Sequence, residues 1–233
     1  MSREAILQAI RRGLRRGPLP ADMRAMLAHR LSTHPRHLVP ERARGERAEL
    51  VSRFIAQARK EYATVTRVPE LAAVPAAIAD YLLAHNLPAR FAMAPHPELF
   101  ALPWAERPML KPEARRAEPG DAAALTLAFA GIAETGTLML PSGAERPTTL
   151  NLLPEHALVL LKASAILGGF EDAWDRLRAR HRDPLTDGFM PRNVMLVTGP
   201  SRSADVEQTL ELGAHGPRHL HIILVDDDSP SEA

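Results

Sequence analysis

Cysteine is absent from the 233-residue sequence. The chain can therefore form no disulfide, use no thiolate nucleophile and hold no iron–sulfur cluster on its own sulfur ligands. Any such cluster that acts with this protein must be bound by a partner. Aromatic residues make up only 4% of the sequence, whereas hydrophobic residues make up 45%. A sizeable core is possible, and leucine, alanine, valine and isoleucine must fill most of it.

Long apolar runs are also missing. No stretch of eighteen apolar residues occurs, so no membrane-spanning helix is expected. The N-terminal sequence MSREAILQAIRRGLRRG contains neither the continuous apolar segment nor the small-residue cleavage site of a signal peptide. These absences lead to the expectation of a cytoplasmic protein.

Several chemical signatures are absent as well. The sequence contains no Walker A or dinucleotide-binding glycine pattern, no Gly-x-Ser-x-Gly elbow and no HExxH motif. His219 and His221 would share one face of a strand, but the sequence indicates no third ligand. We therefore expect no metal site.

The net charge of +1 hides an uneven distribution of charge. Residues 1–60 carry fourteen Lys/Arg and five Asp/Glu, whereas residues 61–233 carry fifteen and twenty-three. A basic arm of this kind can bind nucleic acid, an acidic partner surface or the acidic body of its own chain. Stacking aromatics are nearly missing from the arm, where Phe54 is alone, so nucleic-acid binding is the least favoured of the three.

The order of the predicted elements indicates an α/β protein. Helical spacing of apolar residues predicts a basic N-terminal extension of helices over residues 1–60. Strands and helices then alternate over residues 61–225, which is typical of a mostly parallel sheet covered on both faces. The sequence thus predicts a three-layer α/β/α domain with an added antiparallel hairpin, followed by an acidic disordered tail over 226–233.

The hairpin lies at the centre of the chain. Two short apolar runs, Leu125–Ile132 and Thr137–Leu140, flank Ala133-Glu134-Thr135-Gly136. A carboxylate at a strand end followed by a donor-rich loop is typical of a ligand site in an open α/β sheet. Glu134 is accordingly the candidate catalytic acid, base or nucleophile. The alternative is a tight hairpin in which Glu134 is solvated or binds the adjoining turn.

A second candidate site follows the strand at 193–197. The segment Thr198–Ser203 leads into an expected helix over Val206–Leu212, with Ser203 as its N-cap. Free N–H groups and the helix dipole at such a place favour a carboxylate or a single phosphate. The alternative is a well-capped surface helix without a ligand.

Lys162 follows a strongly apolar run and could pair with Glu134, hold a substrate carboxylate, or extend to solvent. We expect the hairpin and the segment at 198–203 to face each other across one hollow. The candidate ligand-binding residues are Gly131, Thr135, Gly136, Thr137, Ser142, Arg146, Lys162, Gly199, Ser201, Arg202 and Ser203.

Two segments together resemble a known family. They are GIAETGTLML at Gly131–Leu140, extended through Arg146 and His156, and GPSRSADVEQTLELGAHG at Gly199–Gly216. The sequence resembles the LUD-domain proteins, specifically the lactate utilization protein C type. The resemblance implies a fold similar to the ribose-phosphate isomerase and CoA-transferase group. It also implies a part in L-lactate oxidation to pyruvate alongside iron–sulfur partner proteins.

Two functional hypotheses follow. In the first, the chain is a cluster-free component of a lactate-oxidising system that binds a small carboxylate or another anion. In the second, it is an isomerase or acyl-transfer enzyme that uses Glu134. The resemblance assigns no residue to the chemistry, so the site residues rest on physical reasoning alone.

Overall fold

The computed structural model describes residues 2–15, 17–180, 190–204 and 210–227, and it divides into two compact units. The first unit, Met1–Leu38, contains α1 (Arg3–Gly13) and α2 (Ala21–Thr33). Ser2 caps α1, because its hydroxyl accepts a hydrogen bond from the Ala5 N–H. No residue of either helix is buried, as expected of helices too short to form a core.

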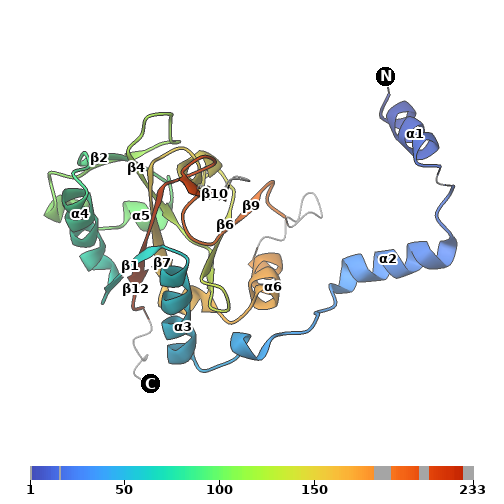
Figure 1. The fold of residues 1–233 in the computed structure, drawn as a ribbon, viewed down its shortest axis with the longest axis horizontal. Helices are drawn as coiled ribbons and strands as arrows, with labels where there is room; N and C mark the ends of the chain where they lie inside the picture. The colour runs from blue at the N-terminus through green and yellow to red at the C-terminus, as the bar shows by residue number, and fades with distance from the viewer. Residues whose placement is uncertain (1, 16, 181–189, 205–209, 228–233) are drawn as a thin grey trace. The chain divides into compact units, whose positions relative to one another are not determined.

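The second unit, Val39–Ala233, is built on a six-stranded sheet in which every pair of neighbouring strands is parallel (Figure 1). This arrangement confirms the predicted α/β fold class. In spatial order the strands are β1 (Thr64–Val68), β12 (His219–Val225), β7 (His156–Lys162), β4 (Ala123–Leu127), β2 (Arg90–Met93) and β3 (Lys111–Ala114).

Both faces of the sheet are buried, so its central strands are nearly continuous apolar runs. In β7, Leu158 and Leu160 face a core shared with α4 (Val74–Ala84). Val159 and Leu161 face a second core, shared with α3 (Arg47–Lys60) and a smaller sheet. The two-residue period of the strand therefore divides its side chains between two cores.

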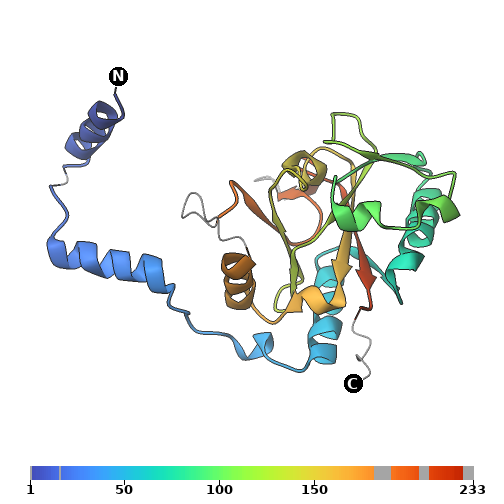
Figure 2. The ribbon, with the colours of Figure 1, turned by 180° about the vertical axis from the view of Figure 1, so that it is seen from behind.

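The smaller sheet has the strand order β8 (Ile166–Leu167), β5 (Ala130–Ile132), β6 (Thr137–Pro141) and β9 (Val194–Val197). The antiparallel β5–β6 pair is the predicted hairpin. The apolar run expected as one strand over Leu125–Ile132 breaks after Leu127, so β4 and β5 belong to different sheets. Helix α6 (Phe170–Arg180) packs on the small sheet, and α4 and α6 lie on opposite sides of the body in both views (Figures 1 and 2).

Short elements complete this unit. They are α5 (Pro97–Phe100), β10 (Arg202–Ala204), β11 (Leu210–Leu212) and 3-10 turns at Glu41–Ala43, Leu71–Ala73, Trp104–Glu106, Thr148–Asn151 and Ala163–Ala165. Among the described residues, no helix is both long and apolar enough to span a membrane.

Two further expectations differ from the structure. Helix α3, assigned above to the N-terminal extension, contributes Val51, Phe54 and Ala58 to the core of the second unit. The helix expected over Val206–Leu212 is wrong in its described part, since Leu210–Leu212 pairs with Arg202–Ala204 as antiparallel strands. Residues 205–209 lie outside the described part.

The beginning of the expected tail is held in place. Asp226 forms an ion pair with Arg67 at 2.7 Å, and the carboxylate of Asp227 accepts hydrogen bonds from the N–H and the hydroxyl of Ser164. The rest of the tail, residues 228–233, lies outside the described residues. The C-terminal end of β12 is thereby tied to the ends of β1 and β7.

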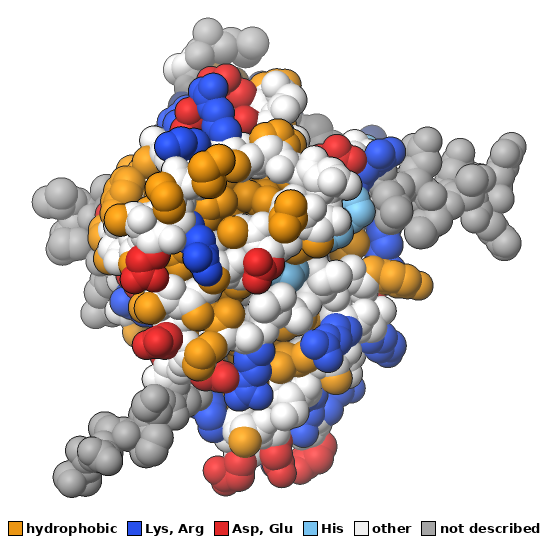
Figure 3. All heavy atoms as spheres, turned by 90° about the vertical axis from the view of Figure 1, so that its left-hand side faces the viewer, with side chains coloured by type: hydrophobic (Ala, Val, Ile, Leu, Met, Phe, Trp, Pro, Cys, Tyr) orange, Lys and Arg blue, Asp and Glu red, His pale blue; other side chains and the backbone are white. Residues whose placement is uncertain are grey.

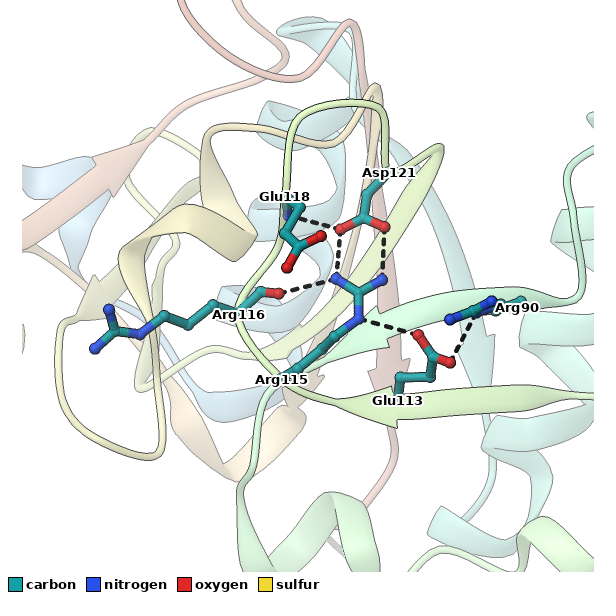
Figure 4. Close-up of polar contacts among 6 residues, drawn as sticks. All are labelled: Arg90, Glu113, Arg115, Arg116, Glu118 and Asp121. Atoms are coloured by element: carbon teal, nitrogen blue, oxygen red, sulfur yellow. Dashed lines mark hydrogen bonds and ion pairs between the residues drawn. The ribbon is translucent and has the colours of Figure 1, made fainter.

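A charged network around Arg115 links two neighbouring strands of the large sheet (Figure 4). Its guanidinium donates to both carboxylate oxygens of Asp121 at 2.8 and 2.7 Å and to Glu113 at 3.0 Å. Glu113 also forms an ion pair with Arg90 at 2.7 Å. The network joins β2, β3 and the loop before β4.

Candidate functional site

A cavity of about 510 Å³ opens where the main sheet meets its loops. Leu127 at the end of β4, Lys162 at the end of β7, and His96 and Glu98 beyond β2 line it. All three strands are parallel neighbours, so their carboxyl ends meet at one edge of the sheet. The charged side chains in the walls are Arg146, Lys162, Arg176, Arg180, Glu98, Glu145 and Asp227.

The strand order explains why a cavity forms here. After β2 the next strand of this sheet is β3 at one edge, whereas after β4 the next strand of this sheet is β7 on the opposite side. The connections diverge between β2 and β4, which leaves a crevice above the strand ends. Open α/β sheets bind their ligands at such switch points.

Arg146 is the most constrained cation of this cavity. Two backbone hydrogen bonds between Gly143 and Arg146, of 3.2 and 3.1 Å, fix the loop that carries it. Its guanidinium is half-buried, and Nη2 lies 2.9 Å from Nε2 of His96. Its Nε is buried and has no hydrogen-bond partner among the described residues. Burial lowers the pKa of Arg146, which means that its charge is incompletely compensated.

The contacts of His96 also indicate that this part of the cavity has too few hydrogen-bond acceptors for its donors. Its Nδ1 accepts a hydrogen bond from the Glu98 N–H at 3.3 Å, and Nε2 faces the Arg146 donor. Burial, followed by the charge of Arg146, lowers the pKa of His96 and favours its neutral form. A neutral imidazole has only one acceptor nitrogen, so it cannot accept from both donors. An anionic oxygen between Arg146 and His96 would accept from an N–H of each.

Lys162 lies in the wall of the same cavity. Its ammonium forms an ion pair with Glu98 and not with Glu134, which was one of the three alternatives for this side chain. Both side chains are only partly exposed, and Lys162 is directed to the cavity rather than to bulk solvent. The strand ends thus place Lys162, which is paired with Glu98, in the same cavity as Arg146, whose Nε has no partner among the described residues.

Two further cations come from α6. Arg176 and Arg180 are one helical turn apart and line the cavity together. The Arg176 guanidinium lies 5.7 Å from the centre of the Phe129 ring. Burial and the positive charges of Arg180 and Arg47 lower the pKa of Arg176. A bound anion would relieve this repulsion.

Glu134 lies elsewhere, in the turn between β5 and β6. Its carboxylate accepts a hydrogen bond from Arg42 at 2.7 Å, and its backbone N–H donates to the Gly168 carbonyl at 3.0 Å. The side chain is only 9% exposed and is not among the residues that line this cavity. The catalytic role of Glu134 stays a prediction, and the contacts point to a structural ion pair.

The segment at 198–203 serves mainly to connect elements. Arg202 forms an ion pair with Glu61 at 2.7 Å and lies over the Tyr62 ring. The Ser201 N–H donates to Pro217 at 2.8 Å. Because Ser203 lies in the strand β10, the expected helix N-terminus is absent from this described segment. An anion site at Gly199, Ser201, Arg202 and Ser203 stays a prediction, without the support of a helix N-terminus in the described residues.

Gly199 and Ser201 line a smaller, mostly apolar cavity of about 200 Å³. Gly199 has φ of +74°, and a Cβ there would lie 2.0 Å from the Glu61 carbonyl oxygen, so only glycine fits this close approach. Leu140 of β6 also lines the smaller cavity, whereas Glu134 and Arg202 do not.

The hairpin and the segment at 198–203 are neighbours that both line the smaller cavity, through Leu140 on one side and Gly199 and Ser201 on the other, but Glu134 is not in its walls. The hydroxyls of Thr135 and Thr137 are 2.7 Å apart, as are those of Thr137 and Thr198. These contacts follow from the pairing of β6 with β9. Glu134 instead points to Arg42, and Arg202 to Glu61.

The other candidate residues have packing roles in the structure. Gly131 lies against Phe54, Leu161 and Ile166. The Ser142 N–H donates to the Asn193 carbonyl, and its hydroxyl accepts from the Asn193 N–H. Of the predicted ligand-binding residues, only Arg146 and Lys162 line the large cavity.

Sequence reasoning missed His96, Glu98, Arg176 and Arg180. His96 and Glu98 follow a predicted strand, which was a usable signal, but the many prolines after Ala94 hid it. The two arginines follow the ordinary spacing of a solvated helix face. Only the tertiary fold brings them to Arg146.

The geometry defines an α/β domain with a cation-rich cavity at the carboxyl ends of its strands. The LUD domain model matches residues 51–225, and the chain belongs to the LUD-domain family. A solved structure of a DUF162 family protein from Deinococcus radiodurans superposes with a TM-score of 0.57 and 24% identity. The superposition covers 78% of this chain and 99% of the Deinococcus chain, and it supports the fold alone.

Two curated relatives match shorter segments. Protein NMB1437 of Neisseria meningitidis serogroup B is 44% identical over 104 residues, which are 44% of this chain and 42% of the relative. Lactate utilization protein C of Shouchella clausii is 34% identical over 116 residues, 48% of each chain. The matches thus span about half the length of these relatives.

Proposed function

We propose that this chain is a cluster-free component of an L-lactate oxidation system and that it binds a small carboxylate or another small anion beside Arg146. Family membership and the similarity to lactate utilization protein C support the first part. The absence of cysteine supports the inference that iron–sulfur partner proteins carry the electrons. One observation carries the second part, namely the buried Nε of Arg146 without a partner in a cavity of about 510 Å³.

The chemistry of the cavity favours a carboxylate. A planar guanidinium matches the two oxygens of a carboxylate with two parallel N–H donors. Arg146 has unused donor capacity, His96 offers a ring N–H in one tautomer, and Lys162 lies in the same wall. These groups can bind and orient a 2-hydroxy or 2-oxo acid, while electron transfer would take place on the partner proteins.

The alternative, an isomerase or acyl-transfer enzyme using Glu134, has less support. Glu134 is engaged by Arg42 and has no cavity beside it among those described. A general base must reach the proton that it abstracts.

Growth and association test the role in the pathway. A strain lacking the gene should fail to grow on L-lactate, and the wild-type gene should restore growth. We expect Arg146→Gln to restore little growth and Arg116→Gln, which removes an exposed guanidinium away from the cavity, to restore it fully. The tagged chain should co-purify with iron–sulfur proteins from lactate-grown cells. Undiminished growth of the deletion strain on L-lactate would contradict the proposal.

A further inference from the structure

A cluster of histidines lies at the opposite end of the main sheet from the anion cavity. His156 begins β7 and His219 begins β12, and the two residues are register partners. Their rings stack with centroids 4.2 Å apart and an interplanar angle of 15°. Glu155 precedes His156, and ligand atoms of all three side chains lie within 4.8 Å of one another. Figure 3 shows histidine side chains (pale blue) at the surface on the α4 side of the body.

The buried member of the cluster is held by a second group. Tyr81 of α4 brings its hydroxyl to 3.0 Å from Nδ1 of His156, and His156 is only 6% exposed. When Nδ1–H donates to the Tyr81 oxygen, the lone pair of Nε2 remains available. Metal-binding histidines typically have their other ring nitrogen fixed in this way, because the contact sets both tautomer and ring orientation.

The charges also suit a cation. Glu155 is exposed and only loosely paired with Arg218 at 3.6 Å. Such a surface pair contributes little, so the carboxylate can exchange this partner for a metal ion.

We propose that Glu155, His156 and His219 bind one divalent transition-metal ion of the zinc class. Two imidazole nitrogens and one carboxylate oxygen are a donor set that suits Zn²⁺ or Co²⁺ better than Mg²⁺ or Ca²⁺. Metal binding requires the exposed side chains of Glu155 and His219 to rotate, because the ligand atoms are up to 4.8 Å apart and the two rings stack. A water molecule completes a four-coordinate site.

The site is structural rather than catalytic. The seven residues of β7 place it roughly 20 Å from Lys162 at the other end of the strand. A metal ion there joins the starts of β7 and β12 and stabilises the folded chain, because it binds the native state in preference to the unfolded one. The proposal is independent of the anion cavity and of any role in lactate use.

Calorimetric titration of the untagged, metal-free full chain with ZnCl₂ tests the site. We expect saturable binding of one ion per chain and a tetrahedral Co²⁺ absorption spectrum. His219→Ala and Glu155→Gln, both at exposed positions, should abolish the saturable phase. Tyr81→Phe should weaken binding about 10–100-fold. His215→Ala, which removes an exposed histidine outside the cluster, should leave binding unchanged.

Two results would overturn the proposal. One is the absence of saturable Zn²⁺ binding to the wild-type chain. The other is binding by His219→Ala and Glu155→Gln that equals the wild type. Circular dichroism of each metal-free variant verifies that it is folded, and the two exposed positions provide independent variants for the same conclusion.

Discussion

Arg146 and His96 are fifty residues apart in the chain, yet Nη2 of the first lies 2.9 Å from Nε2 of the second. The contact joins the loop that follows β6 to the loop that follows β2. The side chains form no hydrogen bond to a carboxylate among the contacts described, and Oε2 of Glu145 lies 3.8 Å from Nε2 of His96. The pair therefore defines the position at which a bound anion would be stabilised most.

The ion pair between Arg42 and Glu134 should matter for stability rather than for ligand binding. Arg42→Met leaves a buried carboxylate without its donor and should lower the free energy of unfolding by about 1–3 kcal/mol. Adding Glu134→Gln to that variant should recover about 1 kcal/mol, because a neutral amide costs less to bury. Urea unfolding of the four proteins measures this coupling. Fully additive effects would show that the two residues do not interact.

Glycine is required at position 136 by the close approach of the hairpin to α3. Gly136 has φ of +69°, and a Cβ there would lie 2.4 Å from the Ala58 nitrogen. Gly136→Ala should therefore cost at least about 2 kcal/mol of stability. Gly143→Ala is the matched control, since no atom lies within 4 Å of its Cβ position, and it should change stability by less than about 0.5 kcal/mol. Equal thermal midpoints for the two variants would contradict the packing described.

The Arg115 network offers a comparison between adjacent arginines. Arg115→Gln removes the donors to Asp121 and Glu113 and should destabilise the chain by about 1–3 kcal/mol. Arg116 contributes only its carbonyl to the network, and its side chain points away from it (Figure 4). Arg116→Gln should leave the unfolding midpoint in urea nearly unchanged. A similar loss of stability in both variants would mean that the hydrogen bonds of Arg115 stabilise the fold no more than the removal of one positive charge can explain.

Stability should fall in mildly acidic solution because two histidines are buried. Burial lowers the pKa of both His156 and His221 to about 4, below the ordinary value of 6.5. The unfolded chain thus binds protons that the native chain does not. The stabilising contribution is complete above pH 6.5 and is lost as the pH falls toward 4, at about 1.4 kcal/mol for each unit of pKa difference.

Urea unfolding at pH 7.5, 6 and 5 measures this loss. His221→Gln should show a shallower decline than the wild type, and His215→Ala an unchanged one. The carboxylates of Asp121 and Glu113 have lowered pKa values, so their contribution is lost only at lower pH, below the ordinary range of a carboxylate. A stability that is constant from pH 7.5 to 5 would contradict the assignment to buried neutral histidines.

Local patterns in the sequence were sufficient for most of the fold. The β-branched run at Thr64–Val68 and the apolar run after His156 are strands, because each fills a place in a sheet buried on both faces. The expected helix at Val206–Leu212 shows the limit of such patterns. Ser203 and Asp205 suit a helix start, but the pairing of β10 with β11 prevails in the described residues.

The site was harder to predict because its members come from distant segments. Arg146 and Lys162 were recognisable as donors near strand ends. His96, Arg176 and Arg180 join them only through the order of the parallel strands and the docking of α6. Glu134 was assigned to the site because its partner, Arg42, is ninety-two residues away and carries no local signal.

Calorimetric titration of the purified full chain with L-lactate, pyruvate and inorganic phosphate tests the central claim most directly. We expect saturable binding of at least one of these anions to the wild type, its loss in Arg146→Gln and its retention in Arg116→Gln and Glu134→Gln. The same anion should raise the thermal unfolding midpoint of the wild type but not that of Arg146→Gln. Undiminished binding by Arg146→Gln would contradict the account.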